Sequence, residues 1–458
     1  MSRCDSSVAT HAAYRMRGFT LIELMVAIAL GLLVSLGLVT LFGATSKTSR
    51  VQNAMAQMQE NGRFAVQRMN YDMRLASRQL VNMNGFSQNA ITGNGIVGWA
   101  NAPEVFVNNI PFPDMASPGL GMPAGWTYGT NNWWALSPRY FFQGYECSSG
   151  ACLPSEPLSS GAKLAIPAAG TSAGNRVPKS DVLIMRYLTG DGVSALNGDF
   201  KTVCSGALNA ITLLKPSAVT ALDAQNNDLM LLVSNGFSEI FQVAVSGSTL
   251  TPINVPNAGL VSCVQTSGVI EAQLFNFSRN FVTVAYWLEL SADPNDATHL
   301  IPSLYRQQAD NTGATLSPTE LVQGVDRLDF LYGVQDATGA VSYGDAGQIS
   351  RTPSGLACSP TPRQYQLVMP PPNTPMEPGC LWRSIKSIEA HLLLNSINNL
   401  YDLTPADMAY RYNSGYAASS IVYDGTSAVP ATMPSGLPFG RVMRREFVAL
   451  SEQRNYNP

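Results

Sequence analysis

The chain has 458 residues and a formal net charge of −3. Charged residues make up 13% of it, against roughly 25% in an average protein, while 38 glycines and 29 prolines indicate many turns and loops. This composition favours a folded, strand-rich and loop-rich body over a disordered one. The sequence contains no basic cluster, so we expect no nucleic-acid partner.

The first predicted element is a long apolar helix over residues 19–42, with Glu23 as its one charged side chain. These 24 residues would rise about 36 Å, enough to cross a hydrocarbon core of roughly 30 Å. A secretory signal would be shorter and would end in a small-residue A-x-A-like cleavage site, which this segment lacks. We therefore predict a retained, single-pass transmembrane helix.

Glu23 needs an explanation, because a carboxylate within a spanning helix costs about 3 kcal/mol on insertion scales. Physics alone leaves two interpretations open. Either the side chain reaches back to the membrane interface near the helix start, or it has a partner in another subunit.

The residues around Glu23 favour the second interpretation. The segment GFTLIEL at 18–24, preceded by Arg15 and Arg17, resembles the class III signal of type IV pilins and type II secretion pseudopilins. The resemblance implies that a prepilin peptidase removes residues 1–18 by cutting between Gly18 and Phe19, and that the new amine of Phe19 is methylated. Glu23 would then be the fifth mature residue, able to pair with the Phe19 ammonium of a neighbouring subunit during assembly.

Two consequences of this cleavage concern the chain's start and its charge. Loss of Arg3, Asp5, Arg15 and Arg17 leaves 25 basic and 30 acidic residues, a net charge of −5. The sequence leaves open whether translation starts at Met1 or at Met16.

Residues 43–80 are predicted to continue the helix as an amphipathic segment. Apolar and small residues recur at steps of three and four, which places them on one helical face. The stripe consists of Val51, Met55, Met58, Gly62, Ala65, Met69, Met73, Ala76 and Leu80. We expect this face to pack on a sheet of the chain's own domain, because a methionine-rich stripe is more often core than recognition surface.

The rest of the chain is predicted to form a β-rich head. Residues 81–176 are rich in Asn, Gly, Pro, Ser and aromatic residues and show no lasting period, which indicates a folded, loop-rich elaboration with short strands. Residues 177–458 form the head proper, with a proline-rich insertion at 351–380. Strands are expected at 181–188, 229–234, 239–245, 281–290, 303–306, 328–334, 384–395 and 442–450. The predicted fold class is α+β: a long N-terminal helix packed on an antiparallel β-sheet, with large loop insertions.

Six cysteines remain after the leader, which itself contains Cys4, and an even number suits an oxidising compartment such as the periplasm. Of the 15 possible connectivities, nearest-neighbour pairing is the simplest. The predicted pairs are Cys147–Cys152, Cys204–Cys263 and Cys358–Cys380. The alternative is that some are free buried thiols. A zinc site is disfavoured, because only His299 and His391 follow the leader and no C-x-x-C pair is present.

Motifs in the head extend the family resemblance. The segments VAYW at 284–287, LYR at 304–306, LVQGVDRL at 321–328 and YGV at 332–334, with residues 441–450, resemble PilW-type minor pilins, which are related to J-type minor pseudopilins. Membership would make the chain a structural, non-catalytic subunit that primes type IV pilus assembly with other minor pilins, the major pilin and a tip adhesin. The head would lie in the periplasm beneath a single inner-membrane anchor, and later in the pilus.

Two other functions are kept as alternatives: a minor pseudopilin of a type II secretion system, and a membrane-tethered periplasmic hydrolase. The hydrolase would use Ser172 in Gly170–Gly174, which fits G-x-S-x-G but is flanked by loop residues rather than a strand and a helix. The G-x-G-x-x-G match at 93–98 is not followed by a helix, so dinucleotide binding is not expected. Asp191, Asn197 and Asp199 could form a calcium loop, but they lack the spacing and the terminal Glu of an EF-hand, so we expect a solvated turn. We expect no cofactor and no metal.

Overall fold

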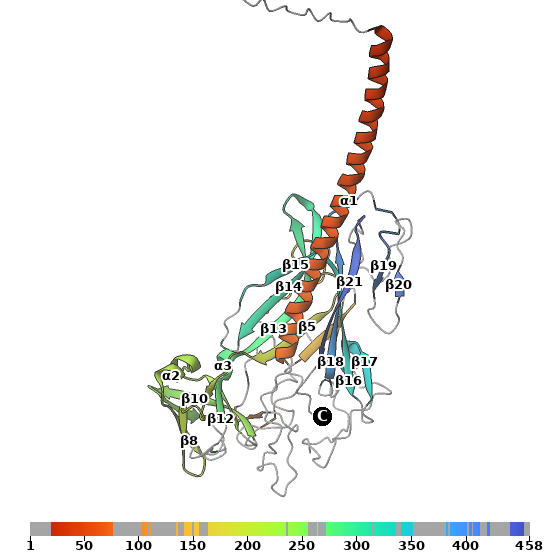
Figure 1. Ribbon diagram of the computed structural model, residues 1–458. Coiled ribbons are helices and arrows are strands. Elements are labelled where there is room, and N and C mark those ends of the chain that lie inside the picture. The colour runs from red at the N-terminus through yellow and green to blue at the C-terminus, as the bar shows by residue number, and fades with distance from the viewer. Residues whose placement is uncertain are drawn as a thin grey trace, which may run out of the picture. The chain divides into compact units, whose positions relative to one another are not determined.

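The computed structural model describes residues 20–76, 103–107, 110, 134–135, 142–148, 151–154, 164–234, 237–254, 263, 272–310, 312, 316–335, 340–350, 382, 385–400, 403–404, 406–412, 419–421 and 440–452 (Figure 1). The chain divides into two units, Met1–Met55 and Ala56–Pro458.

Helix α1, Leu21–Ala76, is 56 residues long. Its residues up to Arg50 are all exposed in the single chain. Among the described residues it is the one helix long and apolar enough to cross a membrane, with a mean hydropathy of 2.6 in its most apolar window. Its hydroxyl groups are satisfied internally: Ser35 and Thr40 donate to the carbonyls of Gly31 and Gly37 at 2.8 and 2.9 Å, which suits an apolar environment.

Six strands form the sheet that we call the main sheet. Its order is β15-β14-β13-β5-β3-β4, with every neighbouring pair antiparallel. The strands are β3 Phe142–Cys147, β4 Cys152–Leu153, β5 Val182–Leu188, β13 Phe281–Asp293, β14 Asp296–Asp310 and β15 Thr319–Gln323. The β13–β14 hairpin is its longest pairing, running from Val282 opposite Asp310 to Asp293 opposite Asp296.

Four further strands form the C-terminal sheet, in the order β17-β16-β18-β21. They are β16 Val325–Gln335, β17 Val341–Gly344, β18 Ile385–Asn395 and β21 Arg444–Glu452. Helix α4, Ala346–Ser350, follows β17, and a small hairpin pairs β19 Tyr410–Tyr412 with β20 Ser419–Ile421.

The remaining nine strands form the side sheet, whose main path is β6-β12-β9-β10-β11-β8-β7. These strands are β6 Val193–Ser194, β7 Phe200–Cys204, β8 Leu208–Leu213, β9 Leu229–Ser234, β10 Phe237–Ser246, β11 Thr249–Ile253 and β12 Ala272–Asn276. Strand β1, Glu104–Val105, runs parallel to β10 and antiparallel to β2, Trp134–Ala135. Helices α2, Pro216–Leu222, and α3, Phe277–Asn280, flank this sheet.

The largest hydrophobic core joins the second half of α1 to the main and C-terminal sheets, along which that part of the helix runs in Figure 1. It also includes one face of the side sheet, through Leu229, Leu231, Ile240 and Phe275. The helix contributes Met58, Ala65, Met69, Met73 and Ala76. The side sheet has a core of its own, built around Phe200, Ile211, Phe241 and Leu274, and α2 covers it with Ala218 and Leu222.

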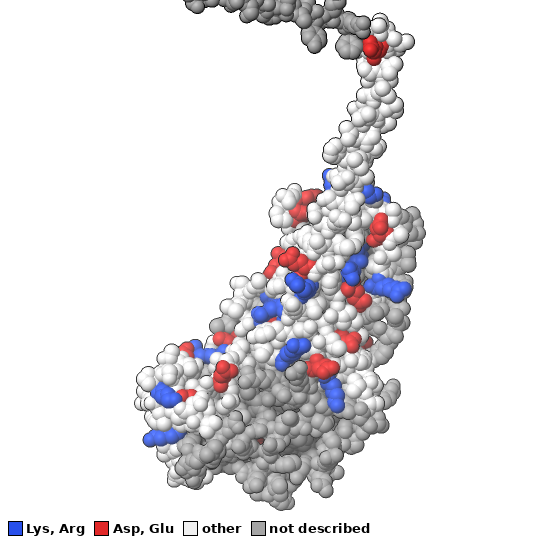
Figure 2. Space-filling view, in the orientation of Figure 1, with Lys and Arg blue, Asp and Glu red and all other residues white. Residues whose placement is uncertain are grey.

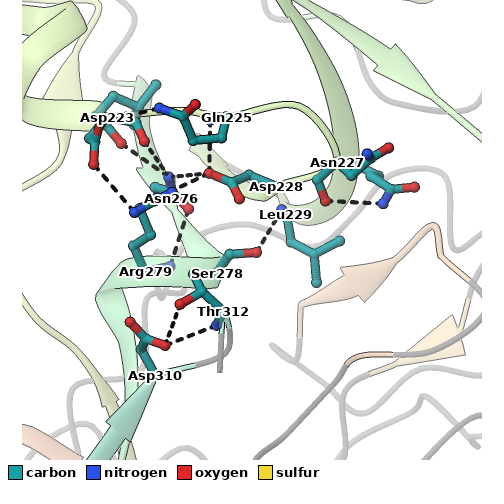
Figure 3. Close-up of polar contacts among 12 residues, drawn as sticks. Asp223, Gln225, Asn227, Asp228, Leu229, Asn276, Ser278, Arg279, Asp310 and Thr312 are labelled. Carbon is teal, nitrogen blue, oxygen red and sulfur yellow. Dashed lines mark hydrogen bonds and ion pairs between the residues drawn. The ribbon is translucent and has the colours of Figure 1, made fainter. Parts of the chain in front are cut away.

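A buried polar cluster lies where the side sheet leads into β13 (Figure 3). The Asn276 amide donates to the Asp228 carboxylate at 2.9 Å and to the Leu222 carbonyl at 3.1 Å, while Arg279 Nε donates to the same Asp228 oxygen at 3.3 Å. The Leu229 amide donates to the Ser278 hydroxyl at 2.9 Å. These bonds connect α2, β9, β12 and α3 through groups that would otherwise be buried unpaired.

The α+β class is confirmed, and a strand lies at each of the eight predicted ranges. The described strands form several sheets rather than the single sheet expected. Short strands were expected within 81–176, and β1 to β4 lie there, with the six-residue β3 pairing into the main sheet. The stripe on α1 is buried from Met58 to Ala76, but Met55 is 37% exposed, and Leu80 lies outside the described residues.

Candidate functional site

The candidate assembly site begins at the start of α1. The Glu23 amide donates to the Thr20 hydroxyl at 3.2 Å, and the Thr20 amide donates back to the Glu23 carboxylate at 3.5 Å. This reciprocal pair is a capping box, which satisfies donors that the first helical turn leaves free. Glu23 therefore has a local partner in the single chain. Gly18 and Phe19 lie outside the described residues.

Charge is almost absent from the first half of α1. From Leu21 to Arg50 its charged residues are Glu23, Lys47 and Arg50, and Figure 2 shows a long uncharged stretch of this helix. Over the described face of the head, basic and acidic side chains are interspersed rather than segregated.

The second half of α1 is fixed to the main sheet by one buried carboxylate, Asp72, which has no exposed surface. Tyr187 on β5 donates to it at 2.8 Å, Arg306 Nε on β14 donates at 2.7 Å, and Tyr286 on β13 donates a third, short bond. Arg68, one helical turn earlier, lies 3.6 Å away. We call this set the Asp72 clamp.

The register of the sheet explains the clamp. Tyr286 lies directly opposite Arg306 in the β13–β14 pairing, and Tyr187 lies opposite Val282 on the next strand, so the three side chains converge beneath the helix. Burial, followed by the charge of Asp72, raises the pKa of both tyrosines. Burial opposes the charge on Arg306, but its hydrogen bond to Asp72 and the charge of that carboxylate outweigh this, so the pKa of Arg306 is raised. The arginine thus remains charged and compensates the buried carboxylate.

Sequence reasoning missed Asp72. The available signal was its position, three residues after Met69 and four before Ala76, which places an acidic residue within the apolar stripe. An acidic residue on a core-facing stripe indicates a buried partner of opposite charge, and Arg306 on a distant strand supplies it.

A close contact between α1 and β21 lies further along the stripe. A Cβ added at Gly62 would lie 2.4 Å from the ring of Phe447. Glycine is therefore required where the helix backbone approaches this aromatic ring.

A second acidic cluster lies where the main and C-terminal sheets meet. The buried carboxylate of Asp181 accepts from the Cys147 amide at 3.1 Å and from the Phe330 amide at 3.0 Å, which links β3 to β16. Burial, together with Glu146 and Asp329, raises the pKa of Asp181 well above its usual value. Burial and the charges of Asp329 and Asp345 raise the pKa of Glu146 to about 7. Among the described residues, no group of His, Cys, Asp and Glu side chains is arranged to hold a metal ion.

In the part of the chain that the structure describes, two disulfides form, Cys147–Cys152 and Cys204–Cys263, with Cα atoms 4.0 and 5.9 Å apart. Cys358 and Cys380 lie outside the described residues.

Among the described residues, the hydrolase site that was kept as an alternative is not assembled. Ser172 lies in an exposed turn, and none of the hydrogen bonds among the described residues joins it to a histidine. His299 instead bonds to Asp293 at 3.1 Å, and His391 bonds to Glu446 at 2.7 Å.

The loop that contains Asn197 and Asp199, whose spacing does not match an EF-hand, binds a lysine side chain. The Lys215 ammonium lies 2.9 Å from the Asp199 carboxylate and also donates to the Asn197 carbonyl. The lysine thus supplies the positive charge that a calcium ion would bring. The glycine motif at 93–98 lies outside the described residues.

Two family models match the chain. The prokaryotic N-terminal methylation motif covers residues 14–39, and type IV pilus-assembly protein W covers residues 286–449. The predicted resemblance to PilW-type pilins is confirmed. The two matches support a minor pilin related to type IV pili. The pilus-assembly match indicates a structural protein that interacts with other pilus components, and the methylation motif with the apolar helix indicates a membrane anchor. No curated protein and no solved structure is significantly similar to the chain.

The matched regions coincide with particular parts of the structure. The methylation motif covers the start of α1, including the Thr20–Glu23 capping box. The assembly-protein match begins at Tyr286 and includes Arg306, two members of the Asp72 clamp, and it continues through the C-terminal sheet to Ala449. Strands β6 to β12 of the side sheet precede it.

Proposed function

We propose that this minor pilin primes type IV pilus assembly and joins the tip complex together with other minor pilins, the major pilin and a tip adhesin. The observation that carries the proposal is the occurrence of both family matches on one chain, in which Asp72 of α1 bonds to Tyr286 and Arg306 of the matched head. A force on the helix therefore reaches the head through buried, charge-compensated bonds.

Maturation is part of the proposal. Prepilin peptidase removes residues 1–18 by cutting between Gly18 and Phe19, and the Phe19 amine is then methylated. The helix over 19–42 holds the subunit in the inner membrane with residues 43–80 continuing it, while the elaboration at 81–176 and the head at 177–458, including the 351–380 insertion, lie in the periplasm. Disulfides between Cys147 and Cys152 and between Cys204 and Cys263 suit that compartment, and we propose the third pair, Cys358–Cys380.

In this proposal Glu23 has two partners in succession, first Thr20 of its own chain and then a group of a neighbouring subunit. Before assembly, Thr20 supplies hydrogen bonds that lower the cost of placing the carboxylate near the membrane. During assembly, the Phe19 ammonium of a neighbouring subunit replaces Thr20 as the partner, which offsets two poorly solvated charges together. The match to the pilus-assembly family favours a pilus over a type II secretion system as the setting.

A comparison of three variants in sheared pilus fractions tests this function. Glu23→Ala should be inserted and cleaved but poorly incorporated, because the neighbour's ammonium loses its partner. Thr20→Ala removes the local cap and leaves the assembly partner, so it should be incorporated nearly as well as the wild type. Glu60→Ala, an exposed acidic position on the same helix, is the matched control. Normal incorporation of Glu23→Ala would contradict the proposal.

A further inference from the structure

The two sulfurs of the Cys147–Cys152 disulfide have unlike surroundings. The cysteines face each other across the β3–β4 pairing. Cys147 is buried, with 4% of its surface exposed, whereas Cys152 is half-buried between two exposed residues, Ala151 and Leu153. A reagent in solution therefore reaches Cys152 more readily than Cys147.

A buried guanidinium lies against the more accessible sulfur. Arg176 Nη2 lies 3.4 Å from the Sγ atom of Cys152, and Nη1 donates to the Ser180 carbonyl at 3.0 Å, which fixes the side chain. Arg176 itself is only 5% exposed. Burial lowers the pKa of Arg176, and the charge of Asp181 acts in the opposite direction. Arg176 keeps its positive charge, because a guanidinium is not deprotonated in a protein. A fixed cation beside a cysteine stabilises the thiolate over the thiol.

The surroundings of Cys147 have the opposite effect. Its amide donates to the buried Asp181 carboxylate, and its side chain lies in the core beside Tyr145 and Ile184. An apolar setting with acidic groups nearby disfavours a thiolate. The structure therefore divides the pair into one sulfur suited to carry a negative charge and one that is not.

We propose that Cys152 is a thiol–disulfide exchange site, where the thiolate facing Arg176 reacts with a small disulfide or with the disulfide of a dithiol–disulfide protein. In the reduced head, the Cys152 thiolate attacks one sulfur of the oxidant. The Cys152–oxidant bond forms, the oxidant's S–S bond breaks, and its second sulfur leaves as a thiolate that takes a proton. Cys147 then loses its proton and attacks Cys152 Sγ, closing the disulfide and releasing the other half of the oxidant. The protein dithiol is oxidised by two electrons and the oxidant is reduced to two thiols.

The experiment uses the full chain in detergent, reduced under native conditions. Reaction with glutathione disulfide, followed by acid quenching and peptide mapping, should place the first mixed disulfide on Cys152. Alkylation by iodoacetamide across a pH series should give Cys152 a lower pH midpoint than Cys204, which serves as an internal reference. A Cys147→Ser variant allows the Cys152 midpoint to be measured with its partner removed and the other disulfide left oxidised.

Arg176→Met should move the Cys152 midpoint up to that of Cys204 and slow its alkylation at pH 7 roughly tenfold, the effect of one pKa unit. Arg176→Lys, which keeps a positive charge, should restore most of the rate, while the Cys204 midpoint stays unchanged in both variants. Three results would overturn the proposal: a first adduct on Cys147, a Cys152 midpoint insensitive to Arg176→Met, or equal midpoints for all cysteines because the reduced hairpin has lost its structure.

Discussion

The family-matched part of the head and the side sheet are stabilised in different ways. The matched part shares one core with α1, and its Tyr286 and Arg306 bind the buried Asp72. One face of the side sheet has a second core, while its other face contributes Leu229, Leu231, Ile240 and Phe275 to the core shared with α1. The polar cluster around Asn276 joins this sheet to β13. The matched part thus binds the second half of α1 through buried charged groups, whereas the side sheet contributes apolar side chains to the shared core.

Loss of the Asp72 carboxylate should have the largest effect. In Asp72→Ala, Arg306 and two tyrosines lose their shared acceptor and a buried charge remains uncompensated, so the free energy of unfolding should fall by about 3–5 kcal/mol. Thermal denaturation of the full chain in detergent measures this. Glu60→Ala on the same helix is the control and should change stability by less than about 0.5 kcal/mol. Equal stability of the two variants would refute the clamp.

The polar cluster offers the complementary test on the side sheet. Asn276→Ala leaves the Leu222 carbonyl and the Asp228 carboxylate without their amide partner, a loss of about 1–3 kcal/mol. Hydrogen exchange should show faster opening of β9 and β12, with β18 and β21 unchanged, and pilus incorporation should persist. Faster exchange of the C-terminal sheet in this variant would show that the polar cluster also stabilises the family-matched part.

The contact between Gly62 and Phe447 should give a smaller effect. In Gly62→Ala, crowding against the ring costs about 1–3 kcal/mol, and the better helix propensity of alanine returns roughly 0.5–1 kcal/mol. We expect a net loss of about 1 kcal/mol by thermal denaturation. The double variant with Phe447→Leu should recover the loss, because the smaller side chain can yield. A stabilised Gly62→Ala single variant would argue against the close approach.

The acidic cluster should make the stability of the head depend on pH. The folded head holds the Glu146 proton more tightly than the unfolded chain does, since the folded pKa is about 7 and the ordinary value 4.5. This stabilisation is complete below pH 4.5 and is lost as the pH rises through about 7. The raised pKa values of Asp181 and His391 act in the same direction.

Denaturation at pH 5 and pH 8 should therefore show a more stable head at pH 5. Glu146→Gln should reduce the difference, because an amide does not titrate. The lowered pKa values of Asp199, Asp293 and Asp296 affect stability only in more acidic solution. A head that is more stable at pH 8 would contradict the assignment of Glu146.

The sequence predicts elements whose signal is local. The apolar run of α1, its stripe from Met58 to Ala76 and the longer strands all follow from periodicity. The division of the strands among several sheets does not follow from periodicity, because pairing joins strands that are far apart in the sequence, such as β5 and β13. Strands β7 and β15 were missed because each has only five residues and a weak alternation of apolar and polar side chains. Asp72 was missed because its meaning depends on Arg306, 234 residues away.

The most direct measurement is mass spectrometry of the mature N-terminus in sheared pili from cells with an active prepilin peptidase. The account predicts a chain that begins with N-methylated Phe19 and is recovered in the pilus fraction. A chain that keeps residues 1–18 in those cells would contradict the central claim that this subunit is processed and assembled as a pilin.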